Sequence, residues 1–67
     1  MNDYLESLRV GTPVKLTIRK GERDYYYTGT ILENNGSRDY IVIKDMIGKE
    51  VYCVYDRIMD LEVKENE

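Results

Sequence analysis

The chain lacks most of the residues on which catalytic and metal chemistry depends. Its 67 residues include no histidine, no tryptophan and a single cysteine. A zinc site built from cysteine and histidine is therefore excluded, and one cysteine cannot form a disulfide within one chain. No run approaches the roughly 18 apolar residues that cross a membrane, and no apolar N-terminal segment resembles a signal peptide. We therefore expect a protein of the reducing cytoplasm without a membrane partner.

The length leaves room for one small core. A domain of this size buries only about 60% of the surface that its unfolded chain exposes, so its margin of stability is thin. Small domains often gain support by associating with further copies of themselves. We therefore expect a single domain over residues 1–67 that forms a homo-oligomer.

The charge is acidic overall and unevenly placed. Ten Lys and Arg face thirteen Asp and Glu, and this net charge of −3 does not favour general binding to phosphate backbones. Residues 9–23 nevertheless hold five basic side chains and one acidic one, whereas residues 62–67 hold three Glu and one Lys. The basic stretch is either part of a charge-balanced solvated surface or a basic stripe on one side of the fold. Residues 64–67 contain no apolar side chain, so we expect this acidic tail to fray.

Hydrophobic spacing predicts a short helix followed by five strands. Tyr4, Leu5 and Leu8 have helical spacing, so residues 1–10 are expected to form a helix that docks on the rest of the domain. From Val14 onward, apolar residues alternate with polar ones, as in a half-buried strand. Similar segments follow, separated by turns that contain Gly or Asn. The five predicted strands are residues 14–19, 25–33, 38–45, 51–55 and 58–63.

Two features favour closure of residues 14–63 into a small barrel. Gly29 lies inside a predicted strand, where glycine marks a bulge, a bend or a close approach of two backbones. Residues 40–43 are four apolar residues in a row, which indicates burial on both faces. Closure would also remove most exposed strand edges. The predicted fold class is mainly β: a five-stranded antiparallel small barrel with a short N-terminal helix.

Several positions match the pattern of a known family in type and spacing. They are Leu8, Gly11, Val14, Leu16, Gly29, Ile31, Ile58 and Leu61. Over nearly its whole length the chain resembles the Sm-like (LSm) family, a variant of the SH3-like small β-barrel. The resemblance implies a non-enzymatic protein that binds single-stranded RNA. It also implies assembly into a ring, in which the fourth strand of one subunit pairs with the fifth strand of the next.

The loop that holds a base in Sm-like proteins has a different composition here. That family carries Asp, then an aromatic residue or His, then Asn, and the corresponding positions are Asn35, Ser37 and Asp39. The stacking residue is missing, and a carboxylate replaces the final amide. Val54 and Tyr55 stand where the family has an Arg-Gly pair before its last strand. The residues expected at the subunit interface are Tyr52, Val54, Tyr55 and Leu61.

The triplet at residues 25–27 is the most unusual local feature, because three tyrosines follow one another. Alternate rings of a strand project from one face, here beside Lys15 and Arg19, and flat rings next to cations hold single-stranded nucleic acid. Alternatively, these rings cover the core or pack on a neighbouring subunit. On the first interpretation the expected RNA contacts are Lys15, Arg19, Lys20, Arg23, Tyr25, Tyr26 and Tyr27.

No arrangement of side chains in the sequence indicates catalysis. Cys53 lies in an apolar strand without a cluster of cations, so we expect a buried and inert thiol. Tyr52 and Tyr55 lie on opposite faces of the same strand, so one of them is expected to pack inward. Carboxylate pairs such as Asp56 with Asp60 lie in turns or on polar faces, where charges need no functional explanation. We expect no enzymatic activity, no cofactor and no metal.

Two classes of function follow from these observations. The first is a binding module for single-stranded RNA. The second is a protein-interaction or structural module of viral, mobile-element or regulatory accessory type, in which tyrosines and strand edges contact a protein partner. RNA binding that weakens steeply with salt would distinguish the first class from the second.

Overall fold

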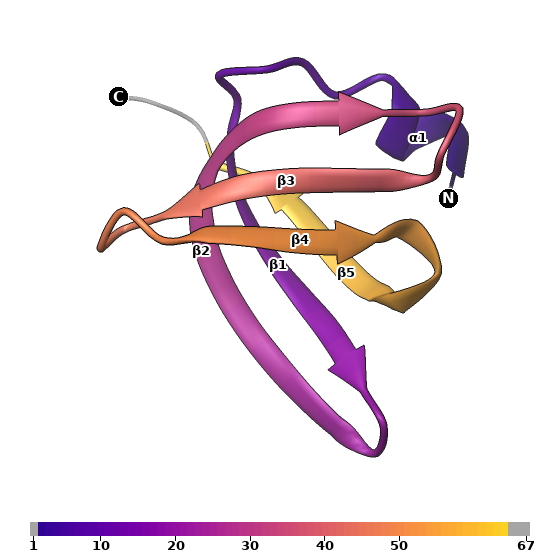
Figure 1. The fold of residues 1–67 in the computed structure, drawn as a ribbon, viewed down its shortest axis with the longest axis vertical. Coiled ribbons are helices and arrows are strands. Elements are labelled where there is room, and N and C mark those ends of the chain that lie inside the picture. Colours follow the sequence, from indigo (N-terminus) through magenta and orange to yellow (C-terminus); the bar gives the residue numbers. More distant parts are fainter. Residues whose placement is uncertain (1, 65–67) are drawn as a thin grey trace.

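The computed structural model describes residues 2–64, which form a short helix and one antiparallel sheet (Figure 1). The prediction of a mainly β fold with an N-terminal helix is confirmed. Of the predicted tail, residues 65–67 lie outside the described residues. Between residues 2 and 64, no helix has the length and apolar character needed to cross a membrane. The elements are α1 (Asn2–Glu6), β1 (Pro13–Lys20), β2 (Arg23–Asn35), β3 (Tyr40–Asp45), β4 (Glu50–Val54), the 3₁₀ turn η1 (Tyr55–Arg57) and β5 (Ile58–Val63).

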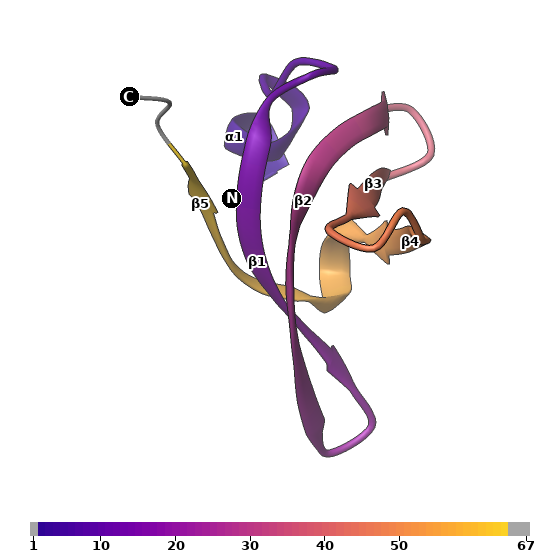
Figure 2. The same cartoon turned by 90° about the vertical axis from the view of Figure 1, so that its left-hand side faces the viewer.

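The strands follow the order β4-β3-β2-β1-β5, and each neighbouring pair is antiparallel. The sheet is strongly curved, and β4 and β5 lie on opposite sides of the central strands (Figure 2). Among the described residues these two strands do not pair with each other, so the expected closure into a barrel is wrong. The physical reason is that β4 borders an open groove, whose opposite wall is the β1–β2 hairpin instead of β5.

The alternating pattern of β1 determines which side of the sheet carries the core. Val14, Leu16 and Ile18 are buried, as predicted, and they pack against apolar residues of every other strand. On β3 only the alternate residues Ile41 and Ile43 are buried. The expected burial of residues 40–43 on both faces is therefore not found, because an open sheet has a single core-facing side.

Gly29 allows β2 and β3 to approach each other closely. A Cβ added at this position would overlap the backbone carbonyl oxygen of Lys44. One of the expected reasons for a glycine within the strand, close backbone approach, is therefore confirmed. Shortly after it, the pairing register shifts between Ile31 and Glu33, so Leu32 is an extra residue in β2. Such a bulge increases the local bend of a strand and contributes to the curvature of the sheet.

The N-terminal segment is held against the sheet by Leu5 and Asn34. The Leu5 side chain is buried in the core. The Asn34 Nδ2 group donates hydrogen bonds to the backbone oxygens of Leu5 (2.7 Å) and Leu8 (2.8 Å). The predicted helix over residues 1–10 ends at Glu6, where the Ser7 N–H donates to the Tyr4 carbonyl (3.1 Å) and the Leu8 N–H donates to the Leu5 carbonyl (3.2 Å). Such bonds over three residues tighten the last turn of a helix. The Asn34 Oδ1 atom accepts a hydrogen bond from the Tyr55 hydroxyl (2.5 Å).

Candidate functional site

The predicted RNA contacts lie on two opposite faces of the β1–β2 hairpin. Residues that are directly opposite in an antiparallel pair share a face, and Thr17 pairs with Tyr26 whereas Ile18 pairs with Tyr25. The core-facing side carries Lys20, Arg23, Tyr25 and Tyr27, and the outer side carries Lys15, Arg19 and Tyr26. The expected placement of alternate tyrosines beside Lys15 and Arg19 is therefore not found. Tyr25 and Tyr27 share their face with Lys20 instead.

The outer face of β1 is balanced in charge. Arg19 Nε donates to Asp24 Oδ1 at 2.8 Å, in the one ion pair found among the described residues. This contact raises the pKa of Arg19 and lowers the pKa of Asp24, through the hydrogen bond first. On the β5 side, Lys15 pairs with Glu62 and Thr17 pairs with Asp60. A basic stripe does not form on this face, because each cation has an acidic neighbour.

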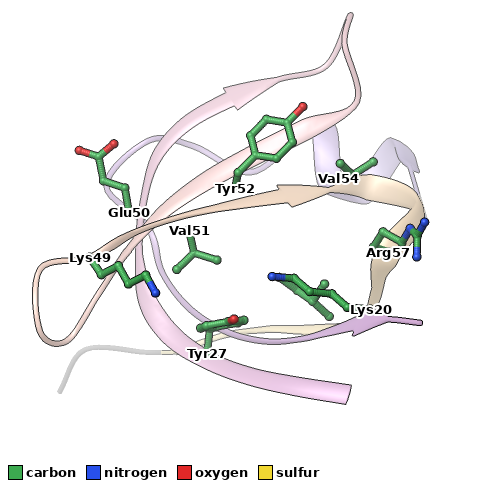
Figure 3. A pocket seen from close by; sticks show the side chains of 9 residues that line it. Lys20, Tyr27, Lys49, Glu50, Val51, Tyr52, Val54 and Arg57 are labelled. Atoms are coloured by element: carbon green, nitrogen blue, oxygen red, sulfur yellow. The ribbon is translucent and has the colours of Figure 1, made fainter. Parts of the chain in front are cut away.

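A groove of about 410 Å³ lies between the core-facing side of the hairpin and β4 (Figure 3). Three cations line it: Lys20 at the end of β1, Lys49 in the β3–β4 turn and Arg57 in η1. Glu50 is the only acidic side chain among the lining residues. The ammonium groups of Lys20 and Lys49 reach into the space between β4 and Tyr27 (Figure 3). The groove is therefore positively charged in a chain whose net charge is −3.

Aromatic and aliphatic side chains form the walls of the groove. Tyr27 is half-buried and packs on the core, and the Lys20 ammonium lies 5.5 Å from the centre of the Tyr25 ring. Tyr52 points to the outer side of β4 and is 59% exposed, with its ring 4.8 Å from the ring of Tyr40. Ile18 and Val51 supply the aliphatic side chains of the lining, whereas Tyr52 and Val54 border the groove from the outer side of β4. Single-stranded nucleic acids bind to such surfaces, because bases stack on aromatic rings and phosphates are attracted to the neighbouring cations.

The groove contains side chains that the sequence did not indicate. Lys20 and Tyr27 belong to the predicted contact set, whereas Lys49 and Arg57 do not. Lys49 lies 29 positions after Lys20, in a turn that reads as an ordinary solvated loop. No local pattern in the sequence predicts their convergence, since only the curvature of the sheet brings β4 opposite the hairpin.

The loop at residues 35–39, which was compared above with a base-binding loop, uses its polar groups for the turn itself. The Asn35 Oδ1 atom accepts hydrogen bonds from the Ser37 hydroxyl (3.2 Å) and from the backbone N–H of Arg38 (3.1 Å). Asp39 has a positive φ of 60°, and its carbonyl accepts the N–H of Tyr55 (2.8 Å). The chain reverses at residues 36–39 through these bonds, and the loop contains no aromatic ring that could stack on a base.

The four residues expected at a subunit interface are divided between surface and core. Tyr52 and Val54 lie on the outer side of β4 and are at least partly exposed. Tyr55 is 2% exposed and Leu61 is 9% exposed, so both belong to the core. The expectation that one tyrosine of the β4 region packs inward is met by Tyr55.

The chemical inventory of the described residues contains a buried thiol and no evident metal site. Cys53 is fully buried, as predicted, and burial raises its pKa to about 11 although the nearby charge of Lys20 opposes the shift. Within residues 2–64, no group of three or more Cys, Asp or Glu side chains is placed to hold a metal ion. A protonated thiol is a poor nucleophile, so Cys53 packs as a small apolar residue.

Neither a family model nor a curated protein matches the sequence. The functional argument therefore depends on the geometry and charge of the groove.

Proposed function

We propose that this protein is a non-enzymatic module that binds single-stranded RNA in the groove between β4 and the β1–β2 hairpin. One observation carries the proposal: Lys20, Lys49 and Arg57 line one groove together with Tyr27, in a molecule whose net charge is acidic. Cations attract the phosphate backbone, and a tyrosine ring offers a stacking surface to any base. The element order, a short helix and five strands, supports the Sm-like resemblance.

The number of cations determines the expected affinity and its salt dependence. Three phosphate contacts on a single strand give a slope of about −2 in a plot of log K against log salt concentration. Stacking of one base on Tyr27 adds about 1–3 kcal/mol. Binding is therefore expected to be weak per protomer, and an assembly with several grooves binds one strand more tightly. We also propose that the protein acts in the reducing cytoplasm.

A charge-matched pair of triple variants tests the proposal. The first variant replaces the groove cations, K20A/K49A/R57A, and the second replaces exposed cations outside the groove, K15A/R38A/K44A. Both lose two lysines and one arginine. In fluorescence anisotropy with labelled oligouridine and oligoadenine, the first variant is expected to bind at least about tenfold more weakly at low salt and to lose the salt slope. Equal weakening in the two variants would show that net charge, and not the groove, holds the RNA.

A second candidate function is self-assembly or protein interaction through β4. The outer side of this edge strand carries Tyr52 and Val54, which lie opposite Val42 and Tyr40 of β3. These four side chains form an apolar surface across β3 and β4. The other edge of β4 lacks a strand partner among the described residues. Tyr52→Lys is expected to lower the mass measured by light scattering if copies associate through this surface. Two results would favour this second function over the first. The mass measured by light scattering would not change when nuclease is added, and the groove variant would bind RNA no more weakly than the wild type.

A further inference from the structure

The end of the β1–β2 hairpin extends beyond the rest of the sheet (Figures 1 and 2). β2 pairs with β1 from Arg23 to Thr30, but its pairing with β3 begins only at Gly29. Residues 23–28 therefore have a strand neighbour on one edge only, within the part of the chain that the structure describes. Their other edge presents unpaired backbone groups, which makes it a template for a further strand.

Apolar side chains gather along this open edge of β2. Met46 and Ile47, in the β3–β4 turn, are 83% and 86% exposed, and Tyr26 is 73% exposed. They are the most exposed large hydrophobic side chains in residues 2–64. All three line one shallow hollow of about 280 Å³ together with Tyr27, Thr28 and Asp45. An unpaired strand edge and an apolar hollow at the same place indicate a binding surface for an added strand.

The turn that presents Met46 and Ile47 has a defined conformation. The Asp45 Oδ1 atom accepts hydrogen bonds from the N–H groups of Ile47 (3.1 Å) and Lys49 (2.8 Å). The Gly48 N–H donates to the Asp45 carbonyl (3.0 Å), at a φ of 88° that glycine adopts without strain. The backbone that carries these exposed side chains is therefore ordered before any partner binds, which lowers the entropic cost of association.

We propose that the open edge of β2 at residues 24–28 pairs with the same edge of a second copy, antiparallel, around a twofold axis at Tyr26. A twofold contact brings each residue opposite a residue of the same segment. In this register Tyr25 lies opposite Tyr27. Asp24 lies opposite Thr28, so no two like charges face each other. The pairing does not depend on RNA binding or on the β4 surface.

The composition of the edge favours a second copy as its occupant. Residues 25–28 are three tyrosines and a threonine, which are good strand residues and carry no charge to prevent pairing. The free edge of β5, by contrast, carries Asp60 and Glu62, and charges of this kind normally protect an edge from association. A small domain also gains the most from a sheet that continues into another protomer.

Two substitutions that place a positive or a negative charge at the twofold axis test the proposal. Tyr26→Lys places two ammonium groups opposite each other, and Tyr26→Glu places two carboxylates there. Each variant alone is expected to halve the mass measured by sedimentation equilibrium, and an equimolar mixture of the two is expected to regain the wild-type mass. The control substitutions are Thr17→Lys and Thr17→Glu, because Thr17 lies on the same face directly across from Tyr26 but away from the open edge.

Cross-linking gives a second measurement that does not depend on charge. Cys53 is buried, so Tyr26→Cys supplies the only accessible thiol, and mild oxidation is expected to produce a covalent dimer. Met59→Cys, on β5 and 46% exposed, is the control and is expected to stay monomeric on a denaturing gel. A wild-type monomer at every concentration, charge variants that keep the wild-type mass, or equal cross-linking of the two cysteine variants would overturn the proposal.

Discussion

Replacement of Asn34 by alanine is expected to undock the N-terminal segment and to remove much of the stability of the domain. The side chain makes three hydrogen bonds, with the carbonyls of Leu5 and Leu8 and with the Tyr55 hydroxyl. Leu5 is fully buried and Tyr55 is 2% exposed, so water cannot readily replace the amide at either group. Leu8 is only partly buried, and its carbonyl can gain a bond to water.

The magnitude follows from the polar groups that lose a partner. The Leu5 carbonyl keeps a hydrogen bond from the N–H of Leu8 (3.2 Å), so the Tyr55 hydroxyl is the buried group that loses its partner. An unpaired buried group costs about 1–3 kcal/mol and the lost bond to Leu5 adds about 1 kcal/mol, so the free energy of unfolding is expected to fall by about 2–3 kcal/mol. A domain of this length has only about 3–10 kcal/mol in total. We therefore expect Asn34→Ala to lower the melting temperature by more than about 10 °C. Ser37→Ala removes an exposed hydrogen bond in the next loop and is the control, with a cost below about 0.5 kcal/mol.

Urea denaturation followed by circular dichroism measures these changes, and limited trypsin digestion after Arg9 reports the docking of the N-terminal segment. Tyr55→Phe removes one of the three bonds and is expected to cost about 1 kcal/mol. The double variant is expected to cost less than the sum of the two, since both changes remove the same hydrogen bond. A stability of Asn34→Ala within about 0.5 kcal/mol of the wild type, or additive effects with Tyr55→Phe, would refute the reasoning.

Three further measurements follow from the core and its titrating groups. Gly29→Ala is expected to lower the free energy of unfolding, measured in urea, by about 2–3 kcal/mol, because the new methyl group meets the rigid carbonyl of Lys44. Gly36→Ala is the control and is expected to cost less, because its methyl group meets only the flexible side chain of Glu6. The Cys53 thiol is expected to react with a maleimide only as fast as the domain opens, so added urea should accelerate its labelling; rapid labelling of the native protein would contradict its burial. Burial raises the pKa of Cys53 from 9.0 to about 11, and burial first and then nearby carboxylates raise the pKa of Tyr55. The folded state therefore keeps protons that the unfolded chain releases, and the free energy of unfolding should fall as the pH rises from about 9 to 11. A Cys53→Ala variant with an equally steep decline would exclude the thiol as a cause.

Local patterns in the sequence predicted the secondary structure well. The alternation of Val14, Leu16 and Ile18 gave the strand and its buried face, because side chains of a strand alternate between two sides. The residues 58–63 predicted for the last strand are those of β5. The errors lie where tertiary contacts replace local ones. The helix stops at Glu6, and Asn34, far along the chain, holds the segment in place through the carbonyls of Leu5 and Leu8.

The sequence by itself determined the class of fold, the number of strands, the buried thiol and the absence of histidine chemistry, since each of these follows from residue type and near-neighbour spacing. The tertiary structure alone decided that the sheet stays open, that Tyr25 and Tyr27 face away from Arg19, and that Lys20, Lys49 and Arg57 meet in one groove. The physical reason is that curvature and register are properties of the whole sheet. They depend on bulges and close contacts between distant strands, and these set which charges become neighbours.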